Sequence, residues 1–141
     1  MKKIIIASMV LLLGATSCQS DADANDKART EKAESMTPTE IEFEVLEHDF
    51  GTVTEGEEVV YEYKFTNVGD NPLFIATATP SCGCTVPSVP DEPIAPGESD
   101  VIKVVFDSQG RVSDNVQKVI NVNANTVPSK TRLVLTGKVV Q

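Results

Sequence analysis

The alternation of apolar and polar side chains is the feature that most constrains this fold. The clearest run holds apolar Val59, Tyr61, Tyr63 and Phe65 at every second position, with Glu62 and Lys64 between the last three. A period of two is that of a half-buried β-strand, whose successive side chains point to opposite faces. The pattern therefore predicts that Phe65 points into a core and that Glu62 points to solvent.

Similar segments recur along the rest of the chain, at residues 41–45, 73–79, 101–106, 116–122 and 132–140. Turn sequences such as NVGDNP and PIAPGES separate them, and no segment carries a helical period. Six or seven short strands within about 100 residues favour two sheets that bury their apolar faces together. We expect an all-β, immunoglobulin-like antiparallel β-sandwich of about seven strands over residues 40–141. The chain has no tryptophan and no widely spaced cysteine pair, which excludes an antibody-type domain.

The N-terminal segment has the features of an export signal. Lys2 and Lys3 precede an apolar run over residues 4–13, and small residues then lead to Cys18. The apolar run is shorter than the roughly 20 residues of a membrane-spanning helix. The segment resembles a bacterial lipoprotein signal, which implies removal of residues 1–17 and acylation of Cys18, with palmitate among the acyl groups. An ordinary secreted protein cleaved near Ala15 is the alternative.

Residues 18–39 are nearly free of aliphatic side chains, so we expect the lipidated cysteine to be followed by a flexible acidic tether. In lipoproteins of this kind, Gln19 after the cysteine implies release to the outer membrane, at its periplasmic face or at the cell surface. The formal net charge of −9 argues against nucleic acid as a partner and against attachment to anionic lipid through a basic face. We expect membrane attachment through the acyl chains on Cys18, and another envelope protein as a partner.

Cys82 and Cys84 flank a single glycine. Residues two apart in extended chain project to one side, so the pair is arranged for one shared task. A disulfide closing a three-residue loop would contribute only about 1.6 kcal/mol in the chain-entropy model, which makes a fold-stabilising staple a poor explanation. Three uses remain open: a local disulfide that shapes the loop, a redox-active dithiol, and a copper(I) or zinc site that includes His48.

No catalytic motif is present. The segment HDFG at residues 48–51 matches the magnesium motif of protein kinases, but the chain is far too short for a kinase. We expect Phe50 to anchor the core, Gly51 to form a turn or bulge, and His48, the only histidine, to be a packing residue. No nucleophile elbow and no zinc-protease helix occurs, so we expect no catalytic residue, no enzyme activity and no cofactor.

Several motifs together carry a family resemblance: HDFG (48–51), EGEEVVYEYKFTNVGDNPL (55–73), SCGCT (81–85), IAPGES (94–99) and LVLTGKV (133–139). In these the chain resembles the bacterial Domain of unknown function 1573 family over residues 41–139. The resemblance implies a fold similar to PapD-like and Hydin-type immunoglobulin folds and a place among secreted lipoproteins, and it implies no activity. We expect a lipid-anchored extracytoplasmic module for protein binding or envelope structure. The alternative is a copper- or thiol/disulfide-handling protein that uses Cys82 and Cys84.

Overall fold

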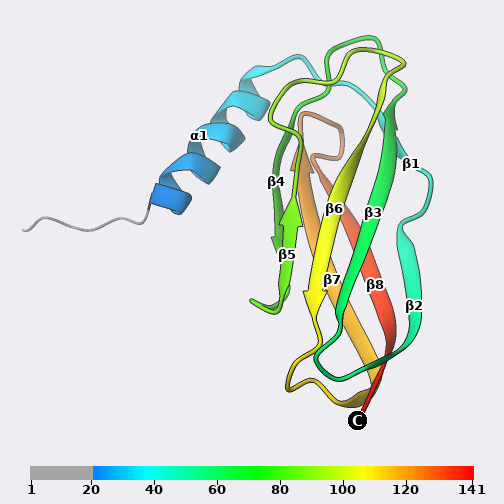
Figure 1. Cartoon of the computed structure of the whole chain (residues 1–141). Coiled ribbons are helices and arrows are strands. Elements are labelled where there is room, and N and C mark those ends of the chain that lie inside the picture. Colours follow the sequence, from blue (N-terminus) through cyan, green and yellow to red (C-terminus); the bar gives the residue numbers. More distant parts are fainter. Residues whose placement is uncertain (1–20) are drawn as a thin grey trace, which may run out of the picture.

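The computed structural model describes residues 21–141, with side chains from Asp23, and shows two four-stranded β-sheets packed face to face (Figure 1). One sheet has the strand order β1-β3-β6-β5 and the other has the order β2-β8-β7-β4. The elements are α1 (Asp21–Ser35), β1 (Ile41–Phe43), β2 (Glu47–Thr54), β3 (Glu58–Asn67), β4 (Ile75–Pro80), β5 (Thr85–Ser88), β6 (Ser99–Asp107), β7 (Ser113–Ala124) and β8 (Lys130–Val140). All strand pairs are antiparallel except β2 with β8, which is parallel.

The predicted all-β sandwich is confirmed, with eight strands in the described residues instead of about seven. The sequence did not reveal β2 and β5 as strands. In β2 the alternation is weak because Gly51 interrupts it, and β5 has only four residues, one of them Pro87. Both are edge strands, where pairing on one side only tolerates such residues.

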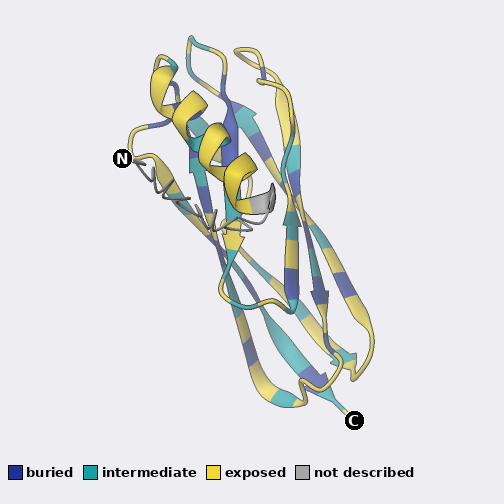
Figure 2. Ribbon diagram, turned by 90° about the vertical axis from the view of Figure 1, so that its left-hand side faces the viewer, coloured by how far each residue is buried: buried dark blue, intermediate teal, exposed yellow. Residues whose placement is uncertain are grey.

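The register predicted for β3 is confirmed. Tyr63 and Phe65 are fully buried, Glu62 is exposed, and this alternation is visible along the strands in Figure 2. The Tyr63 hydroxyl donates a 2.7 Å hydrogen bond to the Val134 carbonyl of the other sheet, and burial raises the pKa of Tyr63. Tyr63 therefore joins the two sheets by packing and by a hydrogen bond.

The HDFG motif has the structural role expected for Phe50 and Gly51. Gly51 has a φ of 74°, and the pairing of β2 with β8 shifts register between Asp49 and Thr52. Phe50 packs on the core, with its ring centroid 5.8 Å from that of Phe106. The strand-like segment expected at residues 41–45 is shorter in the structure: β1 ends at Phe43 before the chain crosses to the other sheet, and Val45 is 40% exposed.

The flexible tether expected over residues 18–39 does not hold for the described part of that segment. Residues 21–35 form α1, whose C-terminal half packs on β4, and Ala33 is only 3% exposed (Figure 1). The reason is that Phe74, just before β4, and Ala76 in β4 lie outside the main core, and Ala33 of α1 packs against them. Overall composition does not reveal so small an apolar contact. None of the helices in residues 21–141 is long and apolar enough to span a membrane.

The expected signal peptide at residues 1–17 and the expected lipidation site Cys18 lie outside the described residues. They remain predictions.

Candidate functional site

The SCGCT segment forms the link between β4 and β5, where the chain crosses from one sheet to the other. Cys82 and Cys84 are joined as a disulfide with Sγ atoms 2.04 Å apart, and both residues are half-buried. The Ser81 amide donates to the Val119 carbonyl at 2.8 Å, and the Asp107 amide donates to the Cys84 carbonyl at 3.0 Å. Because both sheets hold this loop, the two sulfurs have a defined position.

The Thr85 hydroxyl lies beside the disulfide. Thr85 is 2% exposed, and its Oγ1 lies 3.7 Å from Cys82 Sγ and 3.9 Å from Cys84 Sγ. These sulfurs are its hydrogen-bond partners within residues 21–141. A disulfide sulfur is a weak acceptor, whereas a thiolate is a strong one, so this hydroxyl is placed to stabilise a thiolate if the bond is reduced.

His48 does not join the cysteines. It lies on β2, at the opposite edge of the sheet from β4, and its ring stacks on Tyr61 with centroids 3.5 Å apart. In a four-stranded sheet the two edges are about 14 Å apart, far beyond the reach of a shared ion. The hypothesis of a copper or zinc site made by His48, Cys82 and Cys84 is therefore wrong. No other group of three or more His, Cys, Asp or Glu residues in the described chain is placed to hold a metal.

Lys118 was not among the candidate residues predicted from the sequence. It occupies an inward position of β7, and its Nζ lies 5.2 Å from the centroid of the Phe106 ring. Burial, together with the charge of Arg111, lowers the pKa of Lys118. The alternation of Val116, Ile120 and Val122 placed position 118 on the inner face, so this signal was available in the sequence.

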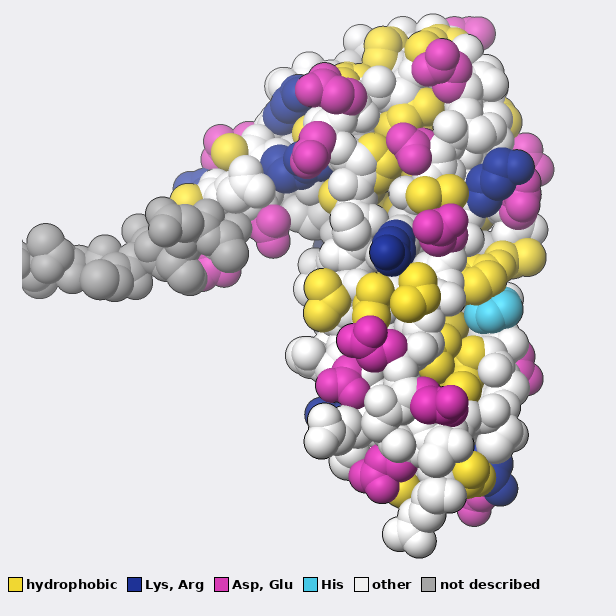
Figure 3. Space-filling model, viewed as in Figure 1, with side chains coloured by type: hydrophobic (Ala, Val, Ile, Leu, Met, Phe, Trp, Pro, Cys, Tyr) yellow, Lys and Arg dark blue, Asp and Glu magenta, His cyan; other side chains and the backbone are white. Residues whose placement is uncertain are grey.

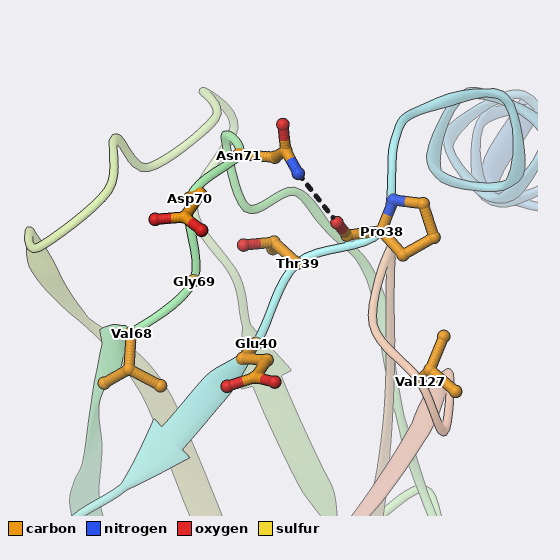
Figure 4. Close-up of a pocket in the computed structure, with 8 residues that line it drawn as sticks. All are labelled: Pro38, Thr39, Glu40, Val68, Gly69, Asp70, Asn71 and Val127. Atoms are coloured by element: carbon orange, nitrogen blue, oxygen red, sulfur yellow. Dashed lines mark hydrogen bonds between the residues drawn. The ribbon is translucent and has the colours of Figure 1, made fainter.

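A shallow cleft of about 330 Å³ opens at the end of the sandwich where the chain enters β1 (Figure 4). It is lined by Pro38, Thr39, Glu40, Val68, Gly69, Asp70, Asn71 and Val127. The Asn71 side chain donates to the Pro38 carbonyl at 3.0 Å, and the Thr39 hydroxyl donates to Asn67 Oδ1 at 3.0 Å. The Asn71 amide and the Thr39 hydroxyl, which could otherwise bind a ligand, are thus used to hold the N-terminal segment in place. The residues that line the cleft include no histidine and no cysteine.

The outer face of the β1-β3-β6-β5 sheet carries a row of three valines, which we call the valine row: Val60, Val105 and Val86. They lie on adjacent strands in direct register, since Val105 pairs with both of the others. Val60 is 52% exposed and Val86 is 63% exposed. Figure 3 shows apolar side chains across the middle of this face, with charged side chains above and below. The doublets Val59–Val60 and Val104–Val105 could have revealed the row, because one member of each must face outward.

The rows next to the valine row are charged. Glu58 pairs with Asp107 on one side, and Glu62 pairs with Lys103 on the other. Three carboxylates and one ammonium thus border the exposed valines. The valine row is thus an apolar strip between two charged rows on the same sheet face.

The fold is similar to several solved structures. A protein of unknown function from Porphyromonas gingivalis W83 matches with a TM-score of 0.64 and 21% identity over 74% of this chain, which spans only 48% of that protein. PapD-like domain 7 of human CEP192 matches with a TM-score of 0.56 and 15% identity, over 74% of this chain and 87% of that domain. The periplasmic chaperone SfaE matches with a TM-score of 0.52 and 11% identity, over 72% of this chain and 58% of the chaperone. These similarities confirm the immunoglobulin-like, PapD-like fold.

No curated protein sequence matches the chain. The family model described as "Protein of unknown function (DUF1573)" matches residues 41–139, which is nearly the whole sandwich. This match confirms the resemblance expected from the HDFG and SCGCT motifs. The chain therefore belongs to the DUF1573 family.

Proposed function

We propose that this protein is a lipid-anchored extracytoplasmic module without catalytic activity that binds another envelope protein through the valine row. The observation that carries the proposal is the row itself, since two of its valines are more than half exposed and all three lie in one register. Contiguous exposed apolar side chains on a sheet face are a feature of protein-interaction sites.

The charges around the row indicate the chemistry of the partner. Glu58, Glu62 and Asp107 outnumber Lys103, and the whole chain has a net charge of −9. A second copy of the same surface would be repelled, whereas a partner with apolar side chains inside a basic border would be attracted. We therefore propose a basic partner surface.

The sandwich edges are less suited to binding by strand addition. Arg29 donates hydrogen bonds to two carbonyls at the start of β4, β5 contains Pro87, and β2 is interrupted by the bulge at Gly51. The fourth edge strand, β1, has only three residues. Each of these features obstructs pairing with an added strand, which favours the sheet face as the binding surface.

A site-specific photocrosslinking experiment in the native host tests the binding role. A crosslinker in place of Val86 should trap one protein, which a crosslinker at Val60 also traps, and Val105→Glu should abolish both products. Val68, which is 48% exposed at the end of the sandwich, is the matched control position. Identical products from Val86 and Val68, or no effect of Val105→Glu in a variant that still folds, would refute the valine row as the binding surface.

The anchor has a separate test. Cys18→Ala should move the protein from the membrane fraction to the soluble fraction, because the acyl chains supply the attachment. Continued membrane association of that variant would refute the lipid anchor, and fractionation of outer and inner membranes tests the proposed outer-membrane location.

A second candidate function is thiol–disulfide exchange at Cys82 and Cys84, favoured by the Thr85 hydroxyl beside both sulfurs. A thiolate of a partner dithiol would attack one sulfur, forming a mixed disulfide and leaving the other cysteine as a thiolate that accepts a hydrogen bond from Thr85. The second thiol of the partner would then release the first cysteine, so that the partner becomes oxidised and the pair becomes reduced.

Thr85→Val tests this second candidate. The variant should raise the thiol pKa of the reduced pair and slow its exchange with a small dithiol, and Thr79→Val, on the exposed part of β4, is the control. Equal exchange rates in native protein and Thr85→Val would count against an exchange function and leave the disulfide as a local clasp.

A further inference from the structure

We infer that α1 is a stiff bracket that holds the sandwich close to the lipid surface, so that the module acts at the membrane and not at the end of a long tether. The inference rests on the lipid anchor proposed at Cys18. It concerns how the binding face is presented to a partner.

The first support is the set of bonds made by Arg29. Its Nε donates to the Ala76 carbonyl at 2.8 Å, and its Nη2 donates to the Ile75 and Pro90 carbonyls at 2.9 and 2.8 Å. Its Nη1 also pairs with Asp91 at 3.0 Å, and the Arg29 side chain is only 16% exposed. Hydrogen bonds from a charged donor are among the stronger ones in proteins, so Arg29 fastens α1 to β4 and to the segment that follows β5.

The second support is the apolar contact around Phe74. This residue is 1% exposed although it lies outside the main core, in a separate cluster with Ala33 and Ala76. The Arg29 guanidinium lies 4.9 Å from the centroid of its ring, and the Lys32 ammonium lies 4.3 Å from it. Undocking α1 would expose a whole phenylalanine ring and lose two cation–π contacts.

The third support is the chain between α1 and β1. The Asn125 side chain donates to the Thr37 carbonyl at 2.9 Å, and the Thr39 amide donates to the Asn125 carbonyl at 2.9 Å. The Asn71 side chain holds the Pro38 carbonyl in the same way (Figure 4). The segment from Arg29 to Thr39 is thus fastened at both ends and cannot act as a hinge without breaking these bonds.

The covalent distance from Cys18 to the bracket is short. Three residue steps separate Cys18 from Asp21, which is at most about 11 Å of chain. The eight helical steps from Asp21 to Arg29 add about 12 Å, so Cys18 lies within about 23 Å of the Arg29 contact. A free tether from Cys18 to Thr39 would instead reach as far as about 75 Å.

The bracket leaves the valine row free. α1 packs along β4, in the sheet opposite to the one that carries Val60, Val105 and Val86. Figures 1 and 2 show the helix on the side of β4, near one end of the sandwich. A partner of the valine row would therefore have to approach at the membrane surface, within the short reach that the bracket allows.

The test uses the lipidated full-length protein bound to phosphatidylcholine vesicles, with a donor dye at Glu92→Cys and acceptor dyes on the lipid head groups. Glu92 is exposed and adjacent to Asp91, which pairs with Arg29. Single-particle energy transfer should give one narrow distribution for the native protein. The double change Arg29→Ala with Ala33→Asp should broaden it toward zero transfer, because undocking restores the long reach. Lys27→Ala, at an exposed position of α1 that makes no contact with the sandwich in the described residues, is the matched control and should leave the distribution narrow.

The outcomes separate the two proposals. Failure of the native protein to bind vesicles would refute the lipid anchor, and the inference with it. Vesicle binding with the same broad distribution in native protein and double variant would refute only the bracket. Hydrogen exchange on the same samples adds a second reading, in which the amides of residues 29–35 should be protected in native protein and should lose that protection in the double variant.

Discussion

Replacing Asn67 with aspartate should destabilise the sandwich severely although the two side chains have the same shape. Asn67 is fully buried, and its Nδ2 donates to the Asn71 carbonyl at 2.8 Å and to the Ile94 carbonyl at 3.0 Å. Asn67→Asp removes both donors and turns a carboxylate oxygen toward the two carbonyls.

The magnitude follows from these contacts. The Ile94 carbonyl keeps its 2.8 Å hydrogen bond from the Leu73 amide. The Asn71 carbonyl loses the donor that Asn67 provides, so the cost of an unpaired acceptor falls mainly on it. An unpaired buried acceptor costs about 1–3 kcal/mol, and an uncompensated buried charge costs about 3–5 kcal/mol. The donors Thr39 and Gly69, at 3.0 and 3.2 Å from Oδ1, still stabilise the other oxygen, so we expect a loss of about 2–5 kcal/mol near neutral pH.

Urea unfolding followed by circular dichroism measures this loss. With a slope of about 2 kcal/mol per molar urea, the midpoint should fall by at least about 1 M. Burial beside two carbonyls raises the folded pKa of the introduced carboxyl above its unfolded value. The deficit is therefore full above the folded pKa and shrinks as pH falls through it, so the variant should be closer to the native protein at pH 5 than at pH 7.5.

Asn121→Asp is the matched control, because Asn121 is exposed on β7 and the substitution introduces the same negative charge. Its cost should stay within about 0.5 kcal/mol. Equal costs for the two variants would refute the role assigned to the Asn67 amide.

Three further outcomes are expected. Phe65→Ala should cost about 3–5 kcal/mol because Phe65 is fully buried, whereas Glu62→Ala on the solvent face should cost little, and equal urea midpoints would show that the β3 register is wrong. Serine at both Cys82 and Cys84 should lower the free energy of unfolding by less than about 2 kcal/mol, since the disulfide closes a very small loop, and a variant that cannot fold would contradict this. Lys118→Met should raise the urea midpoint at neutral pH, because the lowered pKa of Lys118 means that the folded state disfavours the charged ammonium. For the same reason the free energy of unfolding of the native protein should rise as the pH increases through the folded pKa of Lys118. A lower midpoint in the variant would show that the ammonium is stabilising.

The part of the fold that depends on local pattern could be predicted from the sequence. The alternation from Val59 to Phe65 gave the correct inner face of β3, because side chains two apart share a face in any strand. The HDFG and SCGCT motifs pointed correctly to the family, and the glycine of HDFG to a bulge. The cysteine spacing indicated one shared task, and the structure joins the two sulfurs.

The rest depends on contacts between distant residues. The distance between His48 and the cysteines is set by the order of strands β2-β8-β7-β4, which no spacing in the sequence encodes. The docking of α1 depends on Arg29 meeting the carbonyls of Ile75 and Ala76, nearly fifty residues away, and backbone acceptors leave no trace in composition. Residues 21–35 therefore resembled a solvated tether, although they form part of the folded body. Local periodicity determined which side chains are inward, while the pairing order and the free backbone groups at the sheet edges decided what the chain packs against.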